Sequence, residues 1–275
     1  MYSPIPKYRY FYINRGYNGL YILILIIFAA NFKIAQMQNI ENLTVADIVA
    51  QDFRASDVFR KHQIDFCCGG KIKLHDIENH YPVQPALLVA ELNSLFSNQQ
   101  PAAFAYNDWD LDFLADFIER THHKFVKTEI PVLTAYLTKI AEVHGHNHPE
   151  LPEVKSLFEG AAAALLSHLE EEEKVLFPMV RELAKSDKMV TSSEQKEILT
   201  KKLSELIGEH ENEGARFKTI ARLTSNYSIP ADACNTYMVA ISKLEAFEKD
   251  LHQHIHLENN ILFPKTIARE SLLIQ

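Results

Sequence analysis

The sequence predicts an all-α protein in which a small N-terminal helical domain precedes an antiparallel four-helix bundle. The 275-residue chain is 47% hydrophobic with only 8 Gly and 11 Pro, a composition typical of a folded protein that favours helices. From Asp108 onward apolar residues recur with the period of a helix and strand-like alternation is absent. Four long periodic stretches joined by short loops favour an up-down-up-down bundle.

Residues 1–36 differ in character from the rest of the chain. Basic residues precede an apolar run from Leu20 to Ala30, which has the outline of a signal peptide. The run is shorter than the roughly 20 apolar residues that a membrane-spanning helix needs. Because Met37 stands directly before the globular part, we interpret residues 1–36 as an extension from an upstream start codon. A real export or anchoring segment is the alternative, and it is the main objection to a cytoplasmic location.

Residues 37–84 predict the small helical domain. A helix-compatible stretch from Asp52 to Gln63 leads into a turn that carries Cys67 and Cys68, and Gly69-Gly70 then stops the helix. Residues 85–107 predict a linker region with a short helix around Ala86 to Phe96.

Residues 108–275 predict the bundle, because turn-forming residues separate its periodic stretches. Gly145, Pro149 and Pro152 form the first break, and Ser- or Asn-containing segments form the other two. The four expected helices are Trp109 to Val143, Glu153 to Lys185, Ser193 to Ser225 and Ala231 to Arg269.

Charge and cysteine content narrow the possible functions. The net charge is −8, with 36 acidic against 28 basic residues, and no basic stripe is visible, so nucleic acid is not an expected partner. Cys67 and Cys68 are adjacent, which is poor geometry for a structural disulfide. Cys234 is interpreted as an ordinary helix residue. Because three cysteines cannot form a disulfide framework, they indicate a reducing compartment.

An internal repeat contains the candidate metal-binding residues. The motif H-x-x-x-E-x-x-[VI]-L-F-P occurs once from His168 to Pro178 and again from His254 to Pro264. A spacing of four residues places the imidazole and the carboxylate on one face of a helix, one turn apart. Both can therefore reach one metal centre.

The apolar stripes of the helices show that this face points into the bundle. Leu165 leads to His168 and Glu172 in the second helix, and Leu251 leads to His254 and Glu258 in the fourth. Unpaired carboxylates and imidazoles in a core cost several kcal/mol, so a bound cation is the simplest compensation. The stripe of the third helix contributes His210. In the first helix, periodicity does not choose between His122 and His123.

Six such residues suggest two metals. Imidazole and carboxylate suit iron, manganese or zinc, but six ligands are too many for one tetrahedral zinc. Two ions bridged by Glu172 and Glu258, each with two histidines, account for the set. The arrangement leaves room for an oxo or hydroxo bridge and for diatomic ligands, which favours iron. The glutamates beside Glu172 are expected to be solvated. The loop with His144, His146 and His148 is interpreted as a polar turn, with an accessory metal-handling loop as the alternative.

The chain from about Asn39 onward resembles the iron-sulfur cluster repair di-iron proteins, also called the repair-of-iron-centres family. The segment Asp65-Phe66-Cys67-Cys68-Gly69-Gly70-Lys71 looks like the N-terminal domain of that family, and the bundle looks like its hemerythrin-like domain. The resemblance chooses His123 over His122. The metal ligands that it implies are His123, His168, Glu172, His210, His254 and Glu258, around two non-haem iron ions.

The resemblance also implies a function. Members of the family repair or protect iron-sulfur clusters damaged by oxidative or nitrosative stress, so the expected partners are damaged or apo iron-sulfur proteins, with nitric oxide or oxygen as small ligands. Cys67 and Cys68 would form a thiol pair for metal transfer, redox exchange or docking, unless both are buried structural residues. A hemerythrin-like binder or sensor of oxygen or nitric oxide, or a nitric oxide reductase, is the alternative. No membrane partner is expected. A homodimer is compatible with the chain, although no pattern argues for one.

Overall fold

The structure, a computed structural model, describes residues 40–97, 105–185 and 193–272. The apolar run from Leu20 to Ala30 lies outside these ranges, as does most of the segment that follows the expected short helix. Within the described ranges, no helix combines enough length with enough apolar character to cross a membrane. The same ranges contain no β-strand, which confirms the prediction of an all-α protein.

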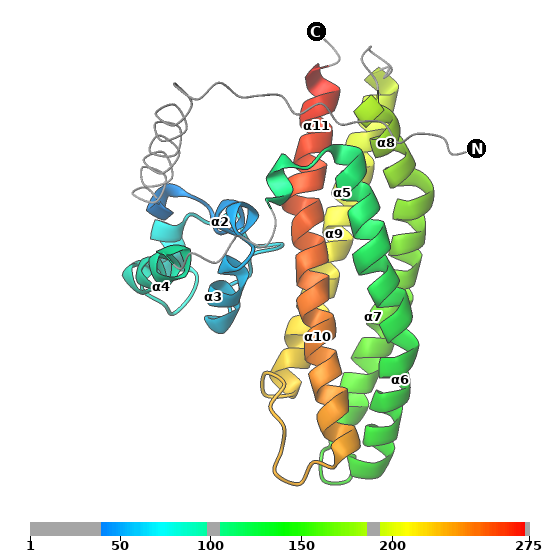
Figure 1. The fold of residues 1–275 in the computed structure, drawn as a ribbon. Helices are drawn as coiled ribbons and strands as arrows, with labels where there is room; N and C mark the ends of the chain where they lie inside the picture. The colour runs from blue at the N-terminus through cyan, green and yellow to red at the C-terminus, as the bar shows by residue number, and fades with distance from the viewer. Residues whose placement is uncertain (1–39, 98–104, 186–192, 273–275) are drawn as a thin grey trace, which may run out of the picture.

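Four helical rods form an antiparallel bundle (Figure 1), as the sequence predicts. Each rod reverses the direction of the one before it, so the first and third rods run opposite to the second and fourth. The first rod consists of α5 (Leu111–Ile118), η4 (Glu119–His123) and α6 (Lys124–His144), and the second of α7 (Leu151–Glu171), η5 (Glu172–Leu176) and α8 (Phe177–Lys185). The third is α9 (Ser193–Leu223), and the fourth consists of α10 (Asn235–Leu257), η6 (Glu258–Leu262) and α11 (Phe263–Leu272).

Three rods contain a π-helical turn, and these turns are η4, η5 and η6. In η5 the Phe177 N–H donates to the carbonyl of Glu172, five residues back, and Phe263 donates to Glu258 in the same way. The proline that follows each phenylalanine has no N–H to donate, so a regular α-helical ladder cannot form there. Single π-turns in helices are frequent at functional sites. Here each begins or ends at a predicted metal ligand.

The small N-terminal unit lies beside the α10–α11 rod (Figure 1). Its first α-helix, α2 (Val45–Gln51), begins at a capping box, in which the side chains of Thr44 and Asp47 each accept a hydrogen bond from the other's backbone N–H. The helix expected in the linker region is α4, and its Leu88 and Leu92 are buried in the same core as α3 and η2. The elements of this part of the chain are η1 (Ile40–Asn42), α2 (Val45–Gln51), α3 (Ala55–Lys61), η2 (Leu74–Asn79), α4 (Pro85–Ser97) and η3 (Tyr106–Asp108).

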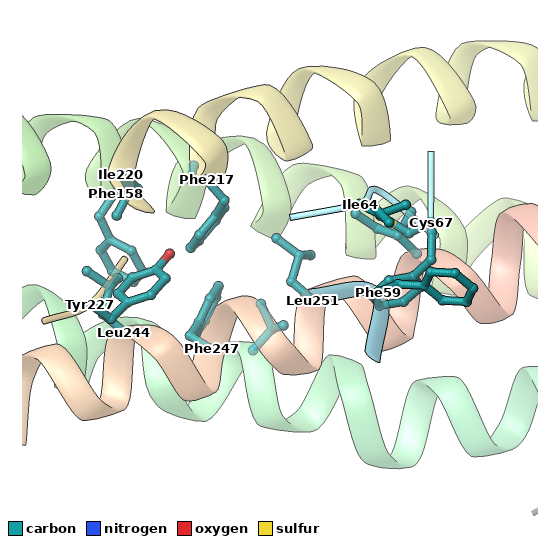
Figure 2. Close-up of a cluster of buried hydrophobic side chains, with 14 of the residues drawn as sticks. Phe59, Ile64, Cys67, Phe158, Phe217, Ile220, Tyr227, Leu244, Phe247 and Leu251 are labelled. Atoms are coloured by element: carbon teal, nitrogen blue, oxygen red, sulfur yellow. The ribbon is translucent and has the colours of Figure 1, made fainter. Parts of the chain in front are cut away.

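Aromatic side chains fill part of the core of the bundle (Figure 2). Phe217 stacks on Phe247 with ring centroids 5.6 Å apart, and Phe158 forms a T-shaped pair with Phe247 at a centroid distance of 5.4 Å. The same buried cluster continues through Leu251 to Phe59 of the small unit. A second apolar cluster contains Leu114, Phe177, Leu206 and Phe263. Along the rods, the predicted ligands lie between these two clusters.

Candidate metal centre

The structure brings the six predicted ligands together in two overlapping groups. His123 and His254 form one group with Glu172 and Glu258, and His168 and His210 form the other with the same two glutamates. Within each group, one ligand atom from every residue lies within 4.8 Å of the others. Each histidine therefore belongs to one group, and both glutamates belong to both.

The two carboxylates divide their oxygens between the groups. Glu172 places Oε1 3.2 Å from His168 Nε2 and Oε2 3.4 Å from His123 Nε2. Glu258 places Oε1 3.1 Å from His254 Nε2 and Oε2 3.3 Å from His210 Nε2. One short contact of each carboxylate is to the histidine one turn before it, and the other is to a neighbouring rod. This is the arrangement that a carboxylate needs to bridge two metal ions.

Burial makes a compensating charge necessary. Both oxygens of Glu172 and of Glu258 are buried and lack a hydrogen-bond partner. Nε2 of His168 and Nε2 of His210 face each other at 3.0 Å. Two buried carboxylates are costly unless a cation or a proton neutralises them. The orphaned oxygens and the converging imidazole nitrogens therefore fit a metal, and this donor set suits iron.

When no metal is bound, protons on the histidines are the alternative way to balance the charge of the two buried carboxylates. Burial alone would lower the pKa of His168, but the nearby Glu172 outweighs it and raises that pKa to about 10. Burial opposes ionisation of Glu258, yet His254 and His210 hold the pKa of this carboxyl well below its usual value. Metal binding must therefore displace protons from the imidazoles.

Three outer side chains orient the histidines. Nδ1 of His123 lies 2.9 Å from Glu173, Nδ1 of His168 lies 2.6 Å from Glu209, and Nδ1 of His210 lies 2.8 Å from the Asn259 side-chain oxygen. Because these oxygens accept a hydrogen bond, Nδ1 carries the proton and the lone pair of Nε2 points to the centre.

Sequence reasoning missed these outer residues. Glu173 was expected to be solvated, but it is half-buried and binds both His123 and Lys127. Its neighbour in the chain is Glu172, Glu209 directly precedes His210, and Asn259 directly follows Glu258. Adjacency to a predicted ligand was therefore the one feature of the sequence that could have identified these residues as partners of the histidines.

The histidine pair of the first rod has two different environments. His123 lies within the group, whereas Nδ1 of His122 lies 2.9 Å from Asp250 Oδ1. The His122 ring stacks on the ring of His254, with centroids 5.6 Å apart. Both side chains are buried, which explains why periodicity alone could not choose between them.

The cysteine turn of the small unit is docked against the fourth rod. Asp65 Oδ1 accepts hydrogen bonds from the backbone N–H groups of Cys67 and Cys68, at 3.0 and 2.9 Å. The Asn260 side chain donates to the Cys67 carbonyl at 3.1 Å. A Cβ at Gly70 would lie 2.5 Å from a backbone oxygen, so only glycine fits there.

The two thiols differ in burial although they are close together. Their sulfur atoms are 3.8 Å apart, and Cys67 is buried whereas Cys68 is partly exposed. The hydrogen bond to Cys68 and burial raise the pKa of Cys67 well above its usual value. Cys67 is therefore a thiol rather than a thiolate at neutral pH.

The third cysteine lies at the opposite end of the bundle, next to the histidine-rich loop. Cys234 is the N-cap residue of α10 rather than an ordinary helix residue, and its Sγ lies 3.2 Å from His144 Nε2. The backbone N–H of Tyr237, together with His144, lowers the pKa of Cys234 to about 7. His148 binds Glu150 and Asp232, and His146 is exposed. None of these residues joins the groups of the metal centre.

Two family models match the chain. The hemerythrin HHE cation-binding domain matches residues 114–266, which include all six predicted ligands. A domain of unknown function that carries the name ScdA_N matches residues 41–96, which include the cysteine turn.

Curated relatives match over most of the chain. The iron-sulfur cluster repair protein ScdA of Staphylococcus epidermidis is 32% identical over 224 residues, which cover 80% of this chain and 96% of that protein. ScdA of Staphylococcus haemolyticus is also 32% identical, with the same coverage. The iron-sulfur cluster repair protein YtfE of Yersinia pestis is 32% identical over 225 residues, which cover 79% of this chain and 93% of that protein. With its cation-binding bundle and its cysteine-containing N-terminal unit, the chain belongs to the family of iron-sulfur cluster repair proteins.

Proposed function

We propose that this protein repairs or protects iron-sulfur clusters with a di-iron centre in its bundle. His123 and His254 hold one non-haem iron ion, and His168 and His210 hold the other. Glu172 and Glu258 bridge the two ions, together with an oxo or hydroxo group. The observation that carries the proposal is that each carboxylate offers one oxygen to each pair of histidines.

The protein contributes ligands, orientation and burial. When bound, the two ions supply exchangeable iron and open coordination positions for small molecules such as nitric oxide or oxygen. Glu173, Glu209 and Asn259 hold three of the imidazoles in one orientation. Glu172 and Glu258 are each the first residue of a π-turn. The recipients of the iron are damaged or apo iron-sulfur proteins.

Iron transfer is the direct test of this function. The iron-loaded full chain is mixed with an apo iron-sulfur protein, a thiol and a sulfide source, and recovery of the cluster is followed by its visible absorption. The native chain should restore the cluster, whereas Glu172→Ala, which removes one bridge, should not. Glu170→Ala is the matched control, because Glu170 is an exposed glutamate two residues before Glu172. Recovery that is equal for both variants would contradict the proposal.

Cys67 and Cys68 are proposed as the thiol pair that passes iron to the recipient. With Asp65 they form a compact group of three metal-binding side chains, and Cys68 is reachable from solvent. Cys68→Ser should therefore leave the iron content of the centre unchanged and slow the recovery of the cluster. An unchanged recovery would contradict a role for Cys68 in the transfer.

Two measurements made beside the transfer assay, nitric oxide consumption and gas binding, separate the alternative functions. Steady consumption of nitric oxide with a supplied electron donor, without transfer of iron, would identify a nitric oxide reductase. Reversible binding of gas, with neither turnover nor transfer, would identify a hemerythrin-like sensor.

A further inference from the structure

A groove between α7 and α9 reaches one half of the centre. Its volume is about 660 Å³, and both His168 and His210 line it. These two histidines are 5% and 3% exposed, whereas His254 is 1% exposed, and His123 and both glutamates are 0% exposed. The groove is therefore a side from which solvent approaches the metal ligands.

The charged side chains that line the groove favour solutes of one sign of charge. Glu171, Glu209 and Glu213 line it, and Arg216 is the one arginine or lysine among its described lining residues. Three of the four Asp, Glu, Lys and Arg side chains that line the groove are therefore carboxylates, and Lys202 pairs with one of them, Glu171. A surplus of carboxylates attracts cations and repels anions. Glu213 is the most buried of the three, at 6% exposure, and lies three residues from His210.

Arg216 spans this groove from α9 to α7. Its Nε lies 3.0 Å from Glu213 Oε2 on its own helix. Its guanidinium reaches Gly160 on α7 so closely that a Cβ at that position would lie 2.4 Å from Nη1. Glycine inside a helix costs about 1 kcal/mol relative to alanine. The space that Gly160 leaves for the guanidinium gives a reason for glycine at this position.

We propose that the α7–α9 groove is the route by which a divalent cation enters and leaves the centre, and that Arg216, paired with Glu213 and seated on Gly160, is its gate. The inference rests on the proposed function, in which the cation is ferrous iron. The guanidinium repels an approaching cation and occupies the carboxylate that would bind it. When Arg216 moves away, Glu213 becomes an oxygen ligand on the way to His168 and His210.

The rate of metal loading tests the gate without relying on repair activity. Cobalt(II), which reports its binding through visible absorption, is mixed rapidly with the metal-free full chain. Arg216→Gln removes the repelling charge, and Gly160→Ala displaces the guanidinium, so both should load about tenfold faster than the native chain. Glu213→Gln should load more slowly. Final occupancy should be the same in all of these proteins.

A control variant and two kinds of negative result separate failure of the gate from failure of the di-iron function. Arg222→Gln removes an exposed charge from the same helix outside the groove and should load at the native rate. Equal rates for Arg216→Gln, Gly160→Ala and the native chain would overturn the gate, and so would an equal acceleration by Arg222→Gln. Failure of the native chain to bind two metal ions would instead refute the proposed di-iron function. If Arg216→Gln does not fold, Gly160→Ala alone decides.

Discussion

The two halves of the candidate centre have the same kinds of ligand but different surroundings. We call His123 and His254 the closed half, and His168 and His210 the groove half. Glu173, the outer partner of His123, is neutralised by Lys127 at 2.7 Å. Glu209, the outer partner of His168, has a side chain that is 48% exposed and faces the groove. One donor set can thus hold one ion firmly and the other exchangeably, depending on what lies around it.

Removing a shared carboxylate should have the largest effect, because it damages both halves at once. In Glu258→Ala we expect loss of both metal ions. The metal-free protein should also lose about 3–5 kcal/mol of stability, because protonated imidazoles remain buried without their counter-charge. Metal analysis and thermal melting measure the two effects. Retention of both ions, or a loss no larger than in Glu170→Ala, would mean that Glu258 is not a shared ligand.

Removing one histidine from each half should then separate the two ions. His168→Ala should keep the closed-half ion, which an added chelator removes slowly. His254→Ala should keep the groove-half ion, which the same chelator removes quickly. Rates that are equal, or reversed, would show that exposure to the groove does not control exchange.

The outer carboxylates should have a smaller effect that is confined to one half. Glu209→Gln should weaken binding of the groove-half ion by about 10–100-fold, the usual range for an outer hydrogen-bond partner of a metal-binding histidine. Glu173→Gln should weaken binding of the closed-half ion instead. Metal titration followed by chelator release measures each affinity. A loss of both ions in either variant would contradict the separation of the halves.

The helical pattern predicted the fold and the ligand set better than it predicted the surroundings of the ligands. A four-residue spacing on a core stripe forces His168 and Glu172 to the same interior face, whatever the loops do. The π-turns and the division of carboxylate oxygens depend on how separate rods pack, which one helix does not encode. The start of the last helix was placed at Ala231, although the helix begins at Asn235 after Cys234 caps it.

The stability of the metal-free protein should fall as the pH rises, and this is the smallest expected effect. The pKa of His168 rises to about 10 in the folded, metal-free protein, whereas an unfolded histidine titrates near 6.5. The folded state therefore holds an extra proton between these values, so the free energy of unfolding should fall by about 1–2 kcal/mol from pH 7 to pH 8.5. Denaturant titrations measure it. The iron-loaded protein should lack this decline, since the metal has displaced the proton.

The central claim is that two ions share one pair of glutamates between two pairs of histidines. Anomalous X-ray scattering at the iron edge, from crystals of the iron-loaded full chain, tests it most directly. The account predicts two peaks about 3.5–4 Å apart, one against His123 and His254 and one against His168 and His210, with Glu172 and Glu258 contacting both. A single peak, or iron bound to carboxylates on the outer surface of the bundle, would contradict it.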